Sequence, residues 1–152
     1  EHVQVPDYEA DVCVAFAQGN IGKAVQLATS DSFNEIKNSA LHLLKNVSKM
    51  EINDIIATVK SVSEFKIDIQ DYLDFLAVWY RDILYFKATR DSNGLIFKDE
   101  LNVITDQINK SSYEGIENIL RGLQTAKTRL NANVNFDLTM ELLFLLIKEN
   151  LV

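Results

Sequence analysis

The 152-residue sequence predicts an all-α fold, a helical bundle of about 6–8 helices. First, hydrophobic residues recur every three or four positions along nearly the whole chain, as they do on one face of an α-helix. Second, the chain contains only 5 glycines and 1 proline, too few chain-breaking residues for a sandwich or barrel of many short strands. Third, Ser-x-x-Glu sequences, which cap helix N-termini, precede several of the hydrophobic stretches.

The order of the predicted helices follows from these patterns and from the turn residues between them. The predicted helices cover approximately residues 7–18, 21–29, 32–48, 48–65, 69–90, 98–109, 112–131 and 136–149. Possible capping boxes are centred on three serines, namely Ser32, Ser48 and Ser111. Turns are expected at Gly19-Asn20, at Asp91–Gly94 and at Asn131–Asn135.

The last predicted helix, 136–149, is apolar almost all round. A helix without a polar face is either central in its own bundle or covered by a partner. The sequence leaves these two alternatives open.

Charge and cysteine content exclude several classes of protein. Lys+Arg 15 against Asp+Glu 22 gives a net charge of −7, which disfavours a phosphate-binding surface and direct contact with nucleic acid. The single cysteine, Cys13, cannot form an internal disulfide, and we expect a cytoplasmic protein. The longest apolar runs are far shorter than the roughly 20 residues that span a bilayer, so we expect no membrane association. The sequence begins at Glu1 without a methionine, which suggests a piece of a longer protein.

No constellation of catalytic or metal-binding residues is present in the sequence pattern. The candidate metal ligands His2, Cys13 and His42 are far apart and have no ligand spacing, so we expect no metal site. The stretch Gly19–Lys23 lacks the glycines and the preceding strand of a phosphate-binding loop. Pairs of acidic residues are typical of solvated helix faces. We therefore expect neither catalytic residues nor a bound cofactor, and a small enzyme is the weakest interpretation.

Two groups of charged or aromatic residues are candidates for contacts with a partner. Arg81 and Asp82 follow Trp79 in a very apolar helix, which places them at a core edge or in an interface. Arg121, Lys127 and Arg129 give the helix over 112–131 a basic C-terminal half. These cations either complement the helix dipole or form a salt-bridging surface towards an acidic partner.

Two stretches match a known family when they are taken together. Residues 131–143 combine an Asn-rich turn with a very apolar last helix that has Glu141 near its middle. Residues 75–84 contain Trp79-Tyr80-Arg81-Asp82, which fits the pattern W-[YF]-R-D. In this order and spacing they resemble the C-terminal domain of the bacterial DNA polymerase III clamp-loader delta-prime family, over about residues 10–150. This resemblance adds Glu141 to the interface candidates.

The N-terminal segment 17–25 is similar to the second sensor motif at the end of the AAA+ lid domain. ATP-binding members carry an arginine there, and Gly22 occupies the position of that arginine. Lys23 lies one residue, or about 100°, further round the helix. The resemblance therefore implies no nucleotide cofactor. It also implies that residues 1–30 are the end of the lid domain and 31–152 the collar domain.

The resemblance implies a non-catalytic domain that assembles the clamp-loader pentamer, which loads the sliding clamp in DNA replication. The expected partners are the tau/gamma and delta subunits, within a holoenzyme that is a DNA-directed DNA polymerase. An isolated collar domain exposes apolar surface, so the sequence leaves open whether it self-associates. One alternative is the collar domain of tau/gamma, which Gly22 argues against. Another is a regulatory helical domain that binds a peptide or small ligand in a groove lined by Trp79 or Tyr80.

Overall fold

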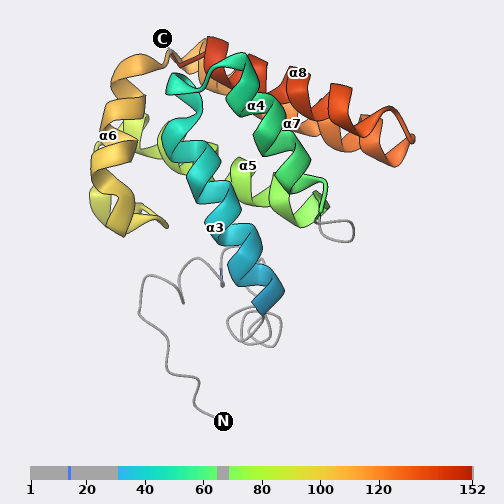
Figure 1. The fold of residues 1–152 in the computed structure, drawn as a ribbon. Helices are drawn as coiled ribbons and strands as arrows, with labels where there is room; N and C mark the ends of the chain where they lie inside the picture. Colours follow the sequence, from blue (N-terminus) through green and yellow to red (C-terminus); the bar gives the residue numbers. More distant parts are fainter. Residues whose placement is uncertain (1–13, 15–30, 65–68, 152) are drawn as a thin grey trace.

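The computed structural model describes residue 14 and residues 31–64 and 69–151. Within these residues the fold is a bundle of six α-helices joined by short 3-10 helices, without a strand, which confirms the predicted fold class (Figure 1). The helices are α3 (Asp31–Asn46), α4 (Ile52–Val62), α5 (Ile69–Thr89), α6 (Leu101–Lys110), α7 (Tyr113–Asn131) and α8 (Phe136–Glu149). The 3-10 helices are η1 (Val47–Lys49), η2 (Ser92–Gly94) and η3 (Lys98–Glu100). The helices predicted over 7–18 and 21–29 lie outside the described residues, as do His2, Cys13 and Gly22.

Helix α5 is the centre of the bundle because it packs against α3, α6 and α7. Its buried residues include Tyr72, Phe75, Trp79 and Ile83, and they recur every three or four positions, as the sequence pattern predicts. Helices α7 and α8 form an antiparallel pair, and α4 packs on α8 (Figure 1). Leucine, isoleucine and aromatic side chains from all six helices join one continuous core.

Two of the predicted caps are displaced by a few residues. Helix α7 is capped by Ser112, whose Oγ accepts a hydrogen bond from the Gly115 N–H at 2.9 Å. The predicted cap, Ser111, instead donates its hydroxyl to the Gln107 carbonyl at the end of α6. Helix α4 begins after Glu51, whose N–H is bound by the Asp54 carboxylate at 3.0 Å, rather than after Ser48.

The third predicted cap is also wrong, because α3 already includes Asp31 and therefore Ser32 lies inside the helix. The turn at Asp91–Gly94 is confirmed, since the Asp91 carboxylate accepts from the Asn93 N–H and caps η2. Helix α8 has a cap that the sequence interpretation did not identify. The Asn135 side chain accepts a hydrogen bond from the Leu138 N–H at 2.9 Å.

Candidate interface surface

Trp79, a predicted interface residue, lies inside the bundle. Its side chain is 0% exposed, and its indole N–H donates to Gln107 Oε1 at 3.0 Å. The Gln107 amide in turn donates to the carbonyl of Leu44 at 2.7 Å, in the last turn of α3, where carbonyls lack partners within the helix. This chain of hydrogen bonds joins three helices, so Trp79 holds the fold together and does not reach a partner.

Asp82 is also buried, so of the two predicted alternatives its position fits the edge of the core rather than an interface. Its carboxylate accepts hydrogen bonds from the backbone N–H groups of Ile96 at 3.0 Å and Phe97 at 2.8 Å. Burial raises the pKa of Asp82, and the two backbone hydrogen bonds partly oppose that shift. The side chain therefore anchors the connection between α5 and α6 to the core.

Three other interface candidates lie closer to the surface. Arg81 is exposed on α5, and Glu141 is half-buried on α8. Lys127 of α7 forms an ion pair with Asp74 of α5, so its charge already has a partner within the bundle. A partly exposed ion pair of this kind contributes only about 0–1 kcal/mol to stability.

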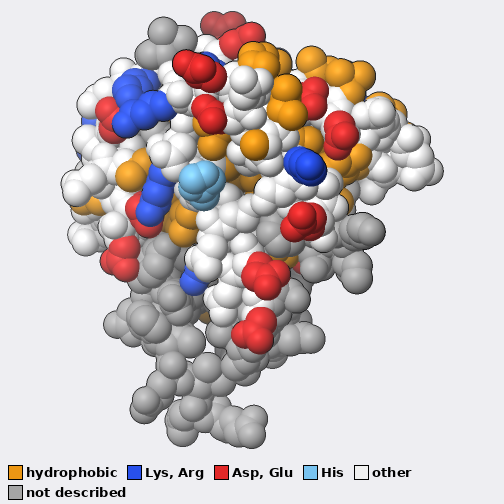
Figure 2. Space-filling view, in the orientation of Figure 1, with side chains coloured by type: hydrophobic (Ala, Val, Ile, Leu, Met, Phe, Trp, Pro, Cys, Tyr) orange, Lys and Arg blue, Asp and Glu red, His pale blue; other side chains and the backbone are white. Residues whose placement is uncertain are grey.

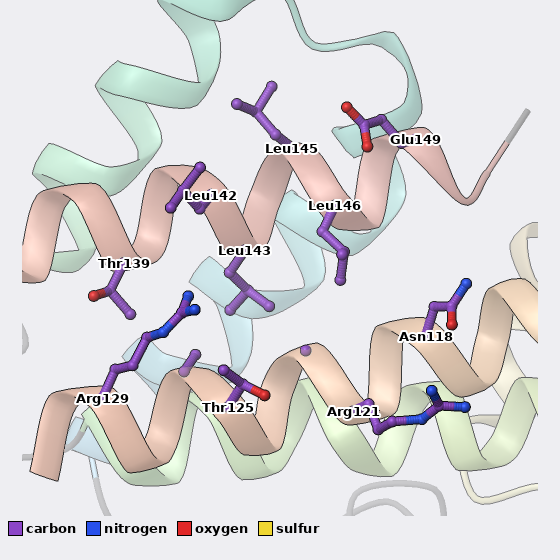
Figure 3. A pocket seen from close by; sticks show the side chains of 12 residues that line it. Asn118, Arg121, Thr125, Arg129, Thr139, Leu142, Leu143, Leu145, Leu146 and Glu149 are labelled. Carbon is purple, nitrogen blue, oxygen red and sulfur yellow. The ribbon is translucent and has the colours of Figure 1, made fainter.

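The remaining candidates, Arg121 and Arg129, line a groove between α7 and α8 with a volume of about 490 Å³ (Figure 3). Arg129 extends from α7 towards Thr139 on α8, and Arg121 lies near the opposite end of the groove (Figure 3). The groove is lined by Asn118, Arg121, Gly122, Thr125, Ala126, Arg129, Thr139, Leu142, Leu143, Leu145, Leu146 and Glu149. Its centre is therefore apolar, and charged groups lie towards its ends.

Gly122 sets the shape of this groove. A Cβ at position 122 would lie 2.4 Å from the Leu146 side chain, so glycine allows α8 to approach α7 closely there. Thr125 and Ala126 continue the row of small side chains along α7. The groove thus has a floor of small residues and a wall of leucines from α8.

Beside the groove, several large hydrophobic side chains are exposed. Leu138 and Leu142 of α8 are 53% and 48% exposed, and Ile52 and Ile56 of α4 are exposed to a similar degree. We call these four residues the apolar face. Figure 2 shows hydrophobic side chains gathered over the region where α4 and α8 lie. Exposed apolar patches of this kind mark sites of interaction with other proteins.

Potential metal ligands lie apart from one another in the part of the chain that the structure describes. Within residues 31–64 and 69–151, no three His, Cys, Asp or Glu side chains gather closely enough to hold a metal ion. His42 is exposed on α3. Burial raises the pKa of the Tyr80 hydroxyl, so it stays protonated at neutral pH. None of the helices in the described part of the chain has the length and apolar character needed to cross a membrane.

Comparison with known proteins identifies the family. A family model described as "DNA polymerase III, delta subunit, C terminal" matches residues 35–149, which is most of the chain. The chain belongs to this family of C-terminal domains from DNA polymerase III. The resemblance inferred from the Trp79–Asp82 motif and the last helix is thus confirmed for this family. The matched residues run from α3 to the end of α8, so the groove and the apolar face both lie inside the family domain.

A curated relative is consistent with this assignment. The chain is 26% identical over 133 residues to DNA polymerase III subunit delta' of Bacillus subtilis (strain 168). The match covers 86% of the chain and 40% of the relative, so the chain spans less than half the length of that protein. No solved structure matches the chain.

The apolar face and the groove of this family member were only partly predictable. Arg121 and Arg129 were identified from their charge, and the structure brings both to the groove. The outward leucines were not among the interface candidates, although Leu138 and Leu142 lie four residues apart on one ridge of α8. The signal for the groove was Gly122, a glycine in the middle of an otherwise good helical stretch.

Proposed function

We propose that this chain is the C-terminal assembly domain of a DNA polymerase III subunit delta-prime. In this role it helps to hold together the clamp-loader pentamer that loads the sliding clamp, with tau/gamma and delta as its neighbours. The domain itself carries out no reaction and works in the cytoplasm. The assembly domain would comprise residues 31–152, and residues 1–30 would be the end of the AAA+ lid domain.

One observation carries the proposal, which is the apolar face of Ile52, Ile56, Leu138 and Leu142 in a chain of this family. Helix α8 is apolar almost all round, and the described residues cover the sides that face α4, η1 and α7 but leave Leu138 and Leu142 exposed. Fully burying one leucine or isoleucine contributes about 1.5–3 kcal/mol. Several such residues on one surface therefore supply a large part of the free energy of a stable association.

The choice between delta-prime and tau/gamma rests on the named relative, a delta' subunit. The ligand-binding alternative predicted a groove lined by Trp79 or Tyr80, and the structure does not place either residue in a groove. Trp79 and Tyr80 are both 0% exposed, and neither lines the groove between α7 and α8. A groove remains, but its lining of leucines and small residues suits a protein segment better than a compact polar ligand.

The test is size-exclusion chromatography with light scattering on the full chain, alone and mixed with the tau/gamma and delta subunits of the same organism. We expect a co-eluting complex that forms without ATP. Ile56→Glu should abolish it, because a buried carboxylate in an apolar contact is strongly unfavourable. Ala57→Glu is the matched control, since it introduces the same charge at the next exposed position of α4, on the flank that faces α3.

Absence of any complex with both wild-type subunits would reject the assembly function. A complex that Ile56→Glu and Ala57→Glu weaken equally would mean that added negative charge, and not the apolar face, is responsible for the loss. Urea unfolding of each variant, followed by circular dichroism, confirms that the bundle is intact in both.

A further inference from the structure

We propose that the groove between α7 and α8 receives one amphipathic helix from a neighbouring clamp-loader subunit, with a carboxylate of that helix at Arg129. This inference rests on the assembly function proposed above and deepens it. It names the structural element that binds, the place where it binds and the charge that orients it.

The dimensions of the groove fit a short helix. Along α7 its lining runs from Asn118 to Arg129, and along α8 from Thr139 to Glu149. At 1.5 Å per residue these spans are about 15–17 Å, the length of roughly three helical turns. A third helix laid between two antiparallel helices is the ordinary packing of a helical bundle.

The floor and wall of the groove fit the apolar side of such a helix. On α7, the exposed Thr125 presents a small side chain to the incoming helix, whereas Ala126 is only 2% exposed and Gly122 already lies against Leu146 of α8. On α8, Leu142 and Leu146 offer a wall for side chains that recur every three or four residues. Leu142 is half exposed and would be covered by the incoming helix.

The charges at the two ends of the groove indicate where a carboxylate of the partner helix would bind. Among the described residues Arg129 forms no ion pair, and its side chain extends into the groove towards Thr139 (Figure 3). A guanidinium at the edge of an apolar groove favours a bidentate contact with a carboxylate. At the other end Glu149 lies on the α8 side, and Arg121 has Glu117 at 3.7 Å. With two glutamates and one arginine, that end carries a net negative charge, so the carboxylate is expected at the Arg129 end.

A second copy of this chain is the less suitable occupant. Each copy carries a net charge of −7, so two copies repel each other at low ionic strength. Moreover, the apolar ridge of α8 begins after Asp137 and ends at Glu149, so a second copy of α8 would carry both acids into the groove. There these acids would lie near Glu149 of the first copy as well as near its arginines.

The experiment measures the dissociation constant of the full chain for the tau/gamma and delta subunits by biolayer interferometry. Arg129→Glu and Leu142→Glu should each weaken binding to one of these subunits about tenfold or more, the range found when a charged or central apolar contact is lost. Arg129→Lys keeps the charge and should retain most of the affinity. Arg90→Glu is the matched control, because Arg90 is exposed just beyond the end of α5 and does not line the groove.

The outcomes separate the two proposals. If both groove variants bind as tightly as the wild type does, the groove inference is overturned. Loss of binding in Ile56→Glu would in that case still support the assembly function. If the wild type binds neither of the two partners, both proposals are rejected. Equal weakening by Arg90→Glu and Arg129→Glu would replace the specific contact by a general effect of charge. A dimer of the chain alone that Arg129→Glu dissociates would assign the groove to a second copy and overturn the proposed partner.

Discussion

Helices α5 and α8 are both rich in hydrophobic residues, but they differ in what covers them. Helix α5 packs against α3, α6 and α7, and even its Asp82 is only 4% exposed. Helix α8 packs against α4, η1 and α7, and its outer ridge carries the exposed Leu138 and Leu142. Hydrophobic content alone therefore does not distinguish a central helix from one that awaits a partner.

The polar groups of the two helices make the same distinction. In α5 the buried polar atoms of Trp79 and Asp82 are engaged, because Trp79 donates to Gln107 and Asp82 accepts from two backbone N–H groups. On the outer ridge of α8 the exposed side chains are leucines, while its ends are fixed by the Asn135 cap and by Lys148, which donates to the Met50 carbonyl. The position of α5 is determined by contacts within the domain, whereas the exposed leucines on the outer ridge of α8 contribute little to holding the bundle together.

Removing the largest buried side chain of α5 should have the largest effect on stability. Trp79→Ala is expected to lower the free energy of unfolding by about 3–5 kcal/mol, since it leaves a large cavity and removes the donor to Gln107. Urea unfolding followed by far-UV circular dichroism measures the change. Trp79→Phe fills most of the cavity but removes the indole N–H, and should cost less. A loss below about 1 kcal/mol in Trp79→Ala would contradict the central position of α5.

Asp82→Asn tests the polar interior of α5. We expect a loss of about 1–3 kcal/mol in the free energy of unfolding, because the amide places an NH2 group where one of the two carboxylate oxygens now faces the backbone N–H donors of Ile96 and Phe97. The loss should depend on pH. Burial raises the pKa of Asp82 above its ordinary value of 3.8, so the folded state binds this proton more tightly than the unfolded state does. The protonated carboxyl group contributes its full stabilisation of the folded state below pH 3.8. This contribution declines as the pH rises through the raised pKa of Asp82 in the folded state.

The free energy of unfolding of the wild type should therefore exceed that of Asp82→Asn by more at about pH 3.5 than at neutral pH. Urea midpoints of both proteins across this range measure the difference. An advantage that grows with rising pH would mean that the hydrogen bonds from Ile96 and Phe97 outweigh the effect of burial on the carboxylate.

The contrast between the two helices also explains which features were predictable from the sequence. Helix positions follow from local periodicity, and α5, α7 and α8 lie within a residue or two of their predicted ranges. The burial of Asp82 could not be predicted, because its donors Ile96 and Phe97 come from a loop after the helix. Which face of α8 points outward could not be predicted either, since a helix that is apolar all round has no polar side to mark the surface.

Two adjacent leucines of α8 give the sharpest form of the comparison, and one of them, Leu142, gives the smallest expected effect on stability. Leu143 is 4% exposed and packs in the core, whereas its neighbour Leu142 is 48% exposed. Leu143→Ala should lower the free energy of unfolding by about 2–5 kcal/mol, and Leu142→Ala by less than about 1 kcal/mol, as measured by urea unfolding. Similar losses at both positions would mean that the outer ridge of α8 is covered within the chain itself. If instead only Leu143 matters for folding, any loss of partner binding in Leu142→Ala reports on the interface alone, because the same substitution leaves the bundle stable.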